Sequence, residues 1–578
     1  MKNYGHVFLV GGILAFLAVR PIPTLAQTLT SRPHIGVEQV PLDDEIYSFL
    51  RHLSVQGLIE GYSEAQLPYS EFEIAEFLRQ VKPIDLSNSE EGLLRKYLRT
   101  FAHEPREAVT VFPAHDAEPF FTGGVFTDKD KYIYQWFDDS TNSDLFVHGV
   151  GSLEYRHKTS DGSVVLGTIG GRFAGTLNGH VGYFLQTTNG ERFGDSALAL
   201  EDPLLAKNRN LSLFTHQFYD YTSAELTYNS DWFTGKIARE AVAIGGGYQD
   251  NIILSSKVPN YDFISLGAHV GAVRYKAMFA SLVADTSFGT DYPVKYMTIH
   301  DLDFFLGHDF ELGFSDIMVF NKRVELGFLN PFSFLDVVKH GLDDNDEDNS
   351  LMGAHTRWRV TPGFELRGEM LLDDILASGI GKGWWGNKWA WQLGGMWAGA
   401  FGIRDLDWAA EWMHIEPYVY THWNTDIDRY TTSQSVLGAQ IGPNALSYWS
   451  QLRWTPTSKW TIDLEGQLVE KGENIYDTTG QLVFNAGGDY NVSLGNQGTE
   501  SNTHFLTGRR VNITTVSLTL EYEPWRDIVL FARGTKKSVD YLSEAPQTPG
   551  VDLSGVAVST APREFPGTLI AIGARALF

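Results

Sequence analysis

The sequence contains no cysteine and, after its first residues, no long apolar run. The missing cysteine excludes a disulfide framework, a thiolate metal site and the modified cysteine of a lipoprotein anchor. A transmembrane helix needs roughly 18 to 20 consecutive apolar residues. The sequence therefore excludes a membrane crossing by helices.

Positive charge is also scarce, because 45 Lys and Arg residues stand against 71 Asp and Glu residues, for a net charge of −26. A polyanion repels nucleic acid, so we expect no nucleic-acid partner. The acidic residues form either an ordinary solvated surface or external loops that bind divalent ions or repel a polymer of like charge.

Aromatic residues and glycine, by contrast, are abundant: aromatics make up 13% of the chain, and there are 57 glycines. This composition suits many strands, tight turns and interfacial tryptophan and tyrosine better than it suits a helical enzyme. The sequence has no G-x-S-x-G, H-E-x-x-H or P-loop pattern. We expect a protein that is not an enzyme and has no cofactor, with Ca²⁺ as the only ion that the sequence suggests.

The first 26 residues have the pattern of an export signal. Lys2 precedes an apolar run over residues 7–19, and residues 24–26 are Thr-Leu-Ala, small enough for a cleavage site. We expect residues 1–26 to be removed and the mature chain to begin near Gln27.

Three stretches with helical spacing follow the signal, at residues 46–57, 70–81 and 93–101. The second begins with the pattern of a capping box. They predict a small helical bundle within a periplasmic domain over residues 27–110. Residues 57–62, GLIEGY, also resemble modules that hold cell wall, so wall binding is an alternative to a plug or packing role.

From about residue 146 onward the apolar residues recur at every second position, as in strands. The end of the chain shows this most clearly, because one face carries Thr568, Ile570, Ile572, Ala574, Ala576 and Phe578. Such a face meets either the core of a soluble β-sandwich or the lipid around a barrel. In the barrel interpretation, Ile570, Ile572 and Phe578 form the signal that the barrel assembly machinery reads.

The connections between these strands alternate in length, as they do in outer-membrane barrels. Short turns are predicted at residues 313–316 and 361–363, for example, and long loops at residues 329–350 and 470–510. The pattern predicts a mainly β fold: a transmembrane antiparallel barrel of about 18 strands over residues 148–578, with the helical bundle on the periplasmic side. Residues 111–147 are a linker or an extra hairpin.

One long loop, residues 342–350, is strongly acidic. Asp344, Asp346 and Asp348 have the alternate spacing of a calcium loop, but the glycine and glutamate of an EF-hand are absent from their places. The loop is therefore either a solvated acidic segment or a divalent-cation site that binds Ca²⁺.

Another long loop, residues 381–392, is rich in tryptophan. Flat indole rings can stack on sugar rings while amide and ammonium groups donate hydrogen bonds. The candidate polysaccharide-binding residues are Trp384, Trp385, Asn387, Lys388 and Trp389. For Trp389 and Trp391 the alternative is an interfacial girdle at the top of a strand.

Six motifs occur in a fixed order between residues 299 and 424: IHDLDF, GFLNPF, DND, LLDDI, GWWGNKWAWQLGG and EPYVYTHWN. In this set the chain resembles the capsule assembly Wzi family, particularly its Bacteroidetes-type branch, which includes gliding-motility-associated members. The resemblance is clearest over residues 295–450. It implies an outer-membrane barrel that binds capsular or exopolysaccharide at the cell surface like a lectin.

The resemblance also implies the surroundings: the outer membrane of a Gram-negative bacterium, with lipid and lipopolysaccharide around a barrel that we expect to be a monomer. One position departs from the family, because Asp301 stands where a basic residue commonly follows the histidine. An acidic residue there, with the negative net charge, favours a neutral glycan or an acidic one bridged by cations. The alternative function is a porin or diffusion channel, since about 18 strands can enclose water.

Overall fold

The protein is described from a computed structural model. The described residues are 36–65, 67–103, 108–111, 124–159, 161–201, 218–230, 232–284, 293–321, 324–342, 348–374, 384–422, 427–492, 504–542 and 557–578. The predicted signal peptide, residues 1–26, lies outside them. Within them, no helix is long and apolar enough to cross a membrane.

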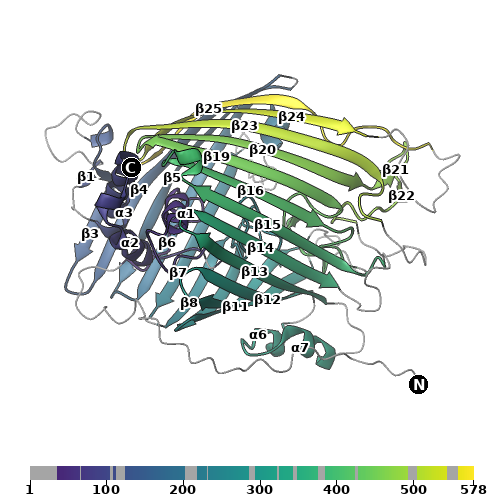
Figure 1. Ribbon diagram of the computed structural model, residues 1–578, viewed down its shortest axis with the longest axis horizontal. Helices are drawn as coiled ribbons and strands as arrows, with labels where there is room; N and C mark the ends of the chain where they lie inside the picture. Colours follow the sequence, from purple (N-terminus) through teal and green to yellow (C-terminus); the bar gives the residue numbers. More distant parts are fainter. Residues whose placement is uncertain are drawn as a thin grey trace.

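The chain forms a closed antiparallel β-barrel of 18 strands, which confirms the predicted fold class (Figure 1). The strands are β4 (Ser143–Lys158), β5 (Gly162–Leu177), β6 (Val181–Gly194), β7 (Phe218–Asn229), β8 (Phe233–Glu240), β9 (Tyr261–Val270), β10 (Val273–Val283), β11 (Val294–Leu306), β12 (Phe310–Phe320), β13 (Asn349–Thr361), β14 (Phe364–Asp374), β15 (Lys388–Ala398), β16 (Leu406–Ile415), β19 (Ala445–Thr457), β20 (Trp460–Glu473), β23 (Arg509–Trp525), β24 (Ile528–Tyr541) and β25 (Gly567–Leu577). The last strand, β25, pairs with the first, β4, and so completes the ring.

Three helices lie at one end of this barrel: α1 (Ile46–Gln56), α2 (Glu71–Gln80) and α3 (Asn88–Ala102) (Figure 1). Gly57 ends α1 in the left-handed conformation, with a φ of 78°, and α2 begins with the predicted capping box. The helices share one buried apolar cluster. We call residues 36–103 the bundle.

The bundle lies beside the short turns. The amide of Gly363, in the turn between β13 and β14, donates to the carbonyl of Val55 in α1 at 2.7 Å. Ser89 of α3 donates to the carbonyl of Thr455 at 2.6 Å, next to the turn between β19 and β20. We call this the bundle end of the barrel, and the opposite end, where most connections are long, the loop end.

The predicted turn at residues 313–316 is wrong, because those residues lie inside β12. The turn is formed instead by residues 307–309, between β11 and β12. Within β12, Gly313 leaves room for side chains of the neighbouring strands. A side chain at Gly313 would collide with the ring of His355 on one neighbouring strand and the carboxylate of Asp303 on the other.

The segment before the barrel contains short strands: β1 (Ala108–Thr110), β2 (Asp130–Tyr132) and β3 (Tyr134–Asp138). β3 forms a hairpin with β4, the first strand of the ring. Residues 112–123 of the segment expected to be a linker or an extra hairpin lie outside the described residues. The first strand of the ring already begins at Ser143, ahead of the predicted boundary at residue 148. The β1 and β2 strands pair in parallel.

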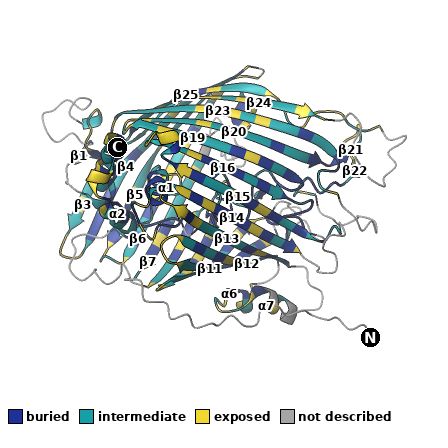
Figure 2. Cartoon of the chain, in the orientation of Figure 1, coloured by how far each residue is buried: buried dark blue, intermediate teal, exposed yellow. Residues whose placement is uncertain are grey.

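Exposed and buried residues alternate along the barrel strands, as Figure 2 shows. On β25, Ile570 and Ile572 are exposed and Ala571 is buried, so the predicted apolar face points outward. The outward face of the barrel carries many large apolar side chains, among them Leu153, Leu393, Trp397, Leu464 and Leu530. This is the surface that outer-membrane barrels turn toward lipid.

Smaller elements lie in the connections. They are α4 (Ser196–Leu200), α6 (Leu326–Leu329), α7 (Leu335–Leu342), the 3₁₀ turns η2 (Pro83–Asp85) and η5 (Ala400–Gly402), and the short strands β17 (Thr431–Thr432), β18 (Ser435–Val436), β21 (Ile475–Tyr476) and β22 (Leu482–Phe484). Figure 1 shows α6 and α7 outside the barrel wall, beside β11 and β12.

Candidate functional site

The connection between β8 and β9, residues 241–260, folds from the loop end into the lumen; we call it the inward loop. Its apolar residues belong to a buried cluster that includes Ile252, Ile253 and Leu254. Tyr248, which precedes these residues in the inward loop, belongs to a second buried cluster together with Val55 of α1. The inward loop and the bundle thus enter the lumen from opposite ends and meet.

Charged groups surround this meeting point. The guanidinium of Arg367 lies 4.3 Å from the ring centroid of Tyr248, and that of Arg51 lies 5.7 Å from it. Both guanidiniums also pair with Glu64 of the bundle, Arg367 at 2.5 Å and Arg51 at 2.8 Å. Burial alone raises the pKa of Glu64, but the charges of Arg51 and Arg367 outweigh burial and lower the pKa to about 2. Glu64 is therefore ionised at neutral pH and ties the bundle to the barrel wall.

Carboxylates on the inner wall hold the backbone of the inward loop. Glu369 on β14 accepts hydrogen bonds from the amides of Gly246, at 2.5 Å, and Ile252, at 2.9 Å. Glu411 on β16 accepts one from the amide of Tyr248 at 2.6 Å. Because an irregular loop cannot pair its own backbone groups as a strand does, these acceptors make its burial possible.

A second long connection, residues 416–444, covers the inward loop. The hydroxyl of Tyr420 donates to the carbonyl of Ile252 at 3.0 Å, and that of Tyr430 donates to the carbonyl of Ile253 at 2.7 Å. Both tyrosines are fully buried. The two connections therefore form one packed unit at the loop end.

In the described part of the chain, one group of side chains has the spacing to hold a metal ion: Asp301, Asp303 and His355, whose donor atoms lie within 4.8 Å of one another. Two carboxylate oxygens and one imidazole nitrogen suit a divalent ion. Each of these three side chains also binds a protein group. His355 Nε2 lies 2.9 Å from Asp303 Oδ1, and Ser315 donates to Asp301 at 2.6 Å. The group is thus a buried hydrogen-bonded cluster on the inner wall.

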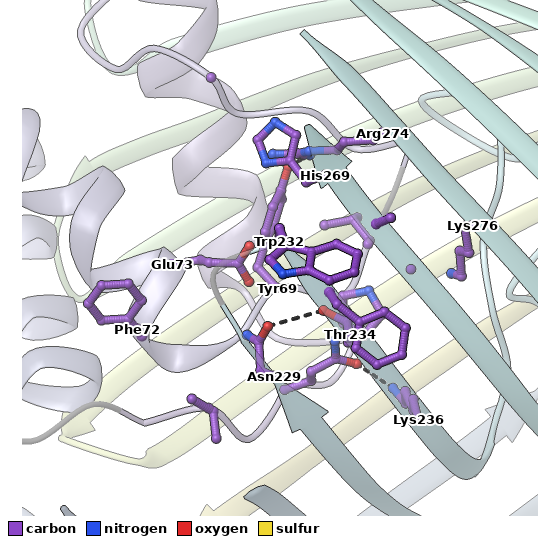
Figure 3. Close-up of a pocket in the computed structure, with 18 of the residues that line it drawn as sticks. Tyr69, Phe72, Glu73, Asn229, Trp232, Thr234, Lys236, His269, Arg274 and Lys276 are labelled. Atoms are coloured by element: carbon purple, nitrogen blue, oxygen red, sulfur yellow. Dashed lines mark hydrogen bonds between the residues drawn. The ribbon is translucent and has the colours of Figure 1, made fainter. Parts of the chain in front are cut away.

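A cavity of about 580 Å³ lies between the bundle and the inner wall formed by β8 to β11 (Figure 3). Tyr69, Phe72 and Trp232 line it together with the basic residues Arg274 and Lys276. The guanidinium of Arg274 lies 4.8 Å from the ring centroid of Phe305. Aromatic faces beside cationic groups can receive the ring and the polar substituents of a small ligand.

The structure separates the residues of the predicted polysaccharide site. Trp384 and Trp385 pair, with ring centroids 5.5 Å apart and planes tilted by 40°, and the amide of Asn387 closes the turn onto the carbonyl of Trp384 at 3.1 Å. Lys388 is buried, and its ammonium binds Asp373 at 2.9 Å and Asp374 at 2.8 Å. Lys388 therefore stabilises the wall and does not present hydrogen bonds to a glycan. This corrects the prediction for that residue.

Trp389 alternates with buried Lys388 along β15 and shares the outward face with Trp391, which is exposed. Its indole nitrogen lies 3.4 Å from Glu416 Oε1. This placement fits the interfacial girdle better than the sugar site. Of the predicted set, Trp384 and Trp385 with Asn387 stay together in the connection before β15.

The other predicted residues lie apart. Asp344 and Asp346 of the predicted cation loop are outside the described residues, and Asp348 directly precedes β13. Phe578 packs its ring on Gly149 of β4, and its amide donates to the Gly149 carbonyl at 2.9 Å. The terminal ring thus lies where the last strand meets the first.

Sequence reasoning did not predict the inward loop. A signal was present, since the Ile252-Ile253-Leu254 run is apolar and lies in a connection that would otherwise face water. Apolar residues in a long loop indicate burial. The cavity and the Asp303–His355 pair depend on contacts between residues far apart in the sequence, for which the sequence carries no local signal.

The closed ring with an apolar outer face and a polar, loop-filled lumen defines the class as an outer-membrane β-barrel. No family model and no curated protein matches the chain. Among solved structures it is similar to Wzi, described as an outer-membrane protein involved in group 1 capsule assembly in Escherichia coli and as a carbohydrate-binding β-barrel. The TM-score is 0.55 at 13% identity, over 93% of this chain and 99% of that one.

Weaker similarities are to OprD of Pseudomonas aeruginosa, with a TM-score of 0.41 and 9% identity, and to OpdK of the same organism, with a TM-score of 0.42 and 8% identity. Each covers 75% of this chain, and they cover 95% of OprD and 99% of OpdK. The similarity to Wzi extends over both the bundle and the barrel, and at this identity it establishes the fold.

Proposed function

We propose that this protein holds exported capsular or exopolysaccharide at the surface of a Gram-negative cell, as a binding protein and not as an enzyme. In this proposal the bundle end faces the periplasm and the loop end faces the exterior. The chain acts as a monomer in lipid and lipopolysaccharide, inserted by the barrel assembly machinery.

The observation that carries the proposal is the contact between Tyr248 and the bundle. A diffusion channel needs a continuous water path between its two ends. Here a loop from one end meets α1 from the other: the guanidinium of Arg51 lies 5.7 Å from the ring centroid of Tyr248, and Val55 belongs to the same buried cluster as Tyr248. A lumen crossed in this way favours a protein that binds at its outer surface.

Two further observations support polysaccharide as the ligand. The paired rings of Trp384 and Trp385 lie in a connection at the loop end, where an exported polymer would pass. The similar solved structure, Wzi, is described as carbohydrate-binding. Indole rings are suited to stack on the C–H faces of sugars.

The alternative is a diffusion channel for small solutes. The cavity of about 580 Å³ favours it, because both the bundle and the inner wall line this space, through residues such as Tyr69 and Lys276.

Two measurements on the purified protein distinguish the functions. We expect retention of the cell's own surface polysaccharide on immobilised protein, and no steady conductance in planar bilayers. Steady large pores without polysaccharide retention would overturn the proposal in favour of the channel. The −26 net charge makes it necessary to test retention both with and without a divalent cation.

A further inference from the structure

The connection between β12 and β13 does not extend away from the loop end but folds back along the outside of the barrel. Its described part, residues 324–342, contains α6 and α7 (Figure 1). We call this segment the flap. Phe328 of the flap packs on Phe320 of β12 with ring centroids 4.8 Å apart, and Leu335 joins the same buried cluster.

Polar side chains on the outward face of the wall bind the flap. His300 on β11 and Asp316 on β12 lie directly opposite each other in register. His300 Nδ1 lies 3.1 Å from the carbonyl oxygen of Ser333, and Asp316 Oδ2 accepts the amide of Leu335, the first residue of α7, at 2.9 Å. The hydroxyl of Tyr275 donates to the carbonyl of Pro331.

The peptide groups of the flap are also bonded within the flap. The amides of Phe328, Ser333 and Val338 donate to flap carbonyls at 3.1, 3.0 and 3.1 Å. The amide of Phe332 donates to the side chain of Asn330 at 3.1 Å. In hydrocarbon every backbone group needs a partner inside the protein, and this segment supplies such partners together with the wall.

The face of the flap that points away from the barrel is apolar. Leu326 is 81% exposed, Phe332 92%, Phe334 61% and Val337 69%. In water, so many large apolar side chains close together would be an unfavourable surface. The barrel wall around the flap exposes apolar side chains of the same kind, such as Val294 and Phe314.

We propose that the flap is embedded in the lipid of the outer membrane, with Leu326, Phe332, Phe334 and Val337 in contact with acyl chains. His300, Tyr275 and Asp316 are then lipid-side positioning residues. They would be unfavourable in hydrocarbon without the flap, and the backbone of the flap would be unfavourable there without them. The inference needs only the membrane barrel and is independent of polysaccharide binding.

The absence of cysteine permits a direct test, because one introduced cysteine is a unique labelling site. Phe332→Cys carries a nitroxide in liposomes of phospholipid and lipopolysaccharide, and its collisions with oxygen and with a water-soluble nickel chelate are measured. Leu464→Cys, exposed on the outward face of β20, is the lipid reference, and Thr479→Cys, exposed in a connection at the loop end, is the water reference.

We expect Phe332→Cys to match Leu464→Cys, with frequent oxygen collisions and few nickel collisions. A match to Thr479→Cys would overturn the proposal, and so would protection from both reagents, which would indicate a second copy of the chain on the flap. Val337→Cys provides a second label site if Phe332→Cys does not fold.

The positioning role is tested by Asp316→Val, which removes the acceptor for the Leu335 amide. The label at residue 332 should then become several-fold more mobile, while Asp316→Asn, which keeps a carbonyl oxygen, should restore most of its order. Equal mobility in all three proteins would overturn the role of Asp316.

Discussion

The hydroxyl of Tyr248 lies 3.1 Å from Oε1 of Glu365, on the inner wall of the barrel. Tyr248 belongs to the inward loop, which enters from the loop end, and Glu365 is the second residue of β14, which begins at the bundle end. This contact therefore links the two ends of the lumen. The same carboxylate binds Arg367 through Oε1 at 2.6 Å and Arg357 through Oε2 at 2.6 Å. The carboxylate of Glu365 is therefore already paired with two guanidinium groups, and the ring of Tyr248 adds an apolar group that fills the lumen beside them.

Replacing Tyr248 with alanine should loosen this plug. The loss of a buried aromatic ring costs about 3 to 5 kcal/mol, and the space that it leaves joins the regions on either side. We expect Tyr248→Ala to lower the unfolding midpoint and to produce conductance in planar bilayers. Tyr248→Phe keeps the ring and should cost about 1 kcal/mol without conductance. Silent bilayers with Tyr248→Ala would show that the ring does not block a path.

Glu369 should control the order of the inward loop. Its carboxylate accepts amides of Gly246 and Ile252, and hydrogen bonds to charged groups are worth about 1.5 to 3 kcal/mol each. We expect Glu369→Gln to speed amide hydrogen exchange at Gly246 and Ile252 by at least tenfold. Glu91→Gln, an exposed helix pair with Arg95, is the matched control and should leave these amides unchanged. Unaltered exchange in Glu369→Gln would mean that packing alone holds the loop.

The docking of α1 should depend on pH. His52 lies between Asp407, at 2.8 Å, and Glu90, at 2.9 Å. Burial alone lowers the pKa of His52, but the two carboxylates outweigh it and raise the pKa from 6.5 to about 10. Because the folded pKa is the higher one, the stabilisation is complete below pH 6.5 and is lost as the pH rises toward 10, by an amount on the order of a few kcal/mol.

The test follows the urea midpoint for loss of the helical circular dichroism signal between pH 6 and 10. The midpoint should fall with rising pH in the natural protein and should fall much less in His52→Gln. A parallel fall in both proteins would assign the pH dependence to other groups.

The paired tryptophans should matter for polysaccharide retention. Lys388 is buried and forms ion pairs with the wall, so it is not available to a sugar. The large contact area that remains in the predicted site is that of the two indole rings. We expect Trp384→Ala with Trp385→Ala to reduce retention at least tenfold while the barrel assembles normally. Trp454→Ala, exposed on the outward face of β19, should leave retention unchanged. Full retention by the double variant would remove these rings from the site.

Gly313 should tolerate no side chain. A Cβ there would collide with His355 and Asp303, whereas a Cβ at Gly466 of β20 would meet nothing within 4 Å. We expect Gly313→Ala to destabilise the barrel by about 1 to 3 kcal/mol or to prevent assembly, and Gly466→Ala to be neutral within about 0.5 kcal/mol. Heat-modifiable migration in gels measures both, and equal behaviour would mean that the His355 ring can move aside.

The barrel itself was predictable, because each strand of such a fold carries its own alternating pattern and each connection its own length. The pattern of residues 568–578 correctly predicted the outward face of β25. The bundle was predictable for a similar reason, since the capping box at Ser70 and the glycine at residue 57 act locally.

The interior of the barrel was not predictable to the same degree. Lys388 was predicted to be a loop residue because four tryptophans surround it in the sequence, yet it begins β15 and pairs with Asp373 on the neighbouring strand. Gly313 was predicted to lie in a turn, yet it lies inside β12, where the absence of a side chain leaves room for His355 and Asp303. In both cases the deciding partner is on a neighbouring strand, and a single sequence does not reveal which residues become opposite.

One ion pair joins the two extremes of the folded chain. Arg575, three residues from the terminus, binds Glu45 at the start of the bundle at 2.6 Å and Glu521 at 2.9 Å. Because β25 lies between β24 and β4 and closes the ring, the bundle gains this contact only once β25 is in place. Together with the hydrogen bonds of Val55 and Ser89 to the wall, this contact couples the final seating of the bundle to closure of the ring.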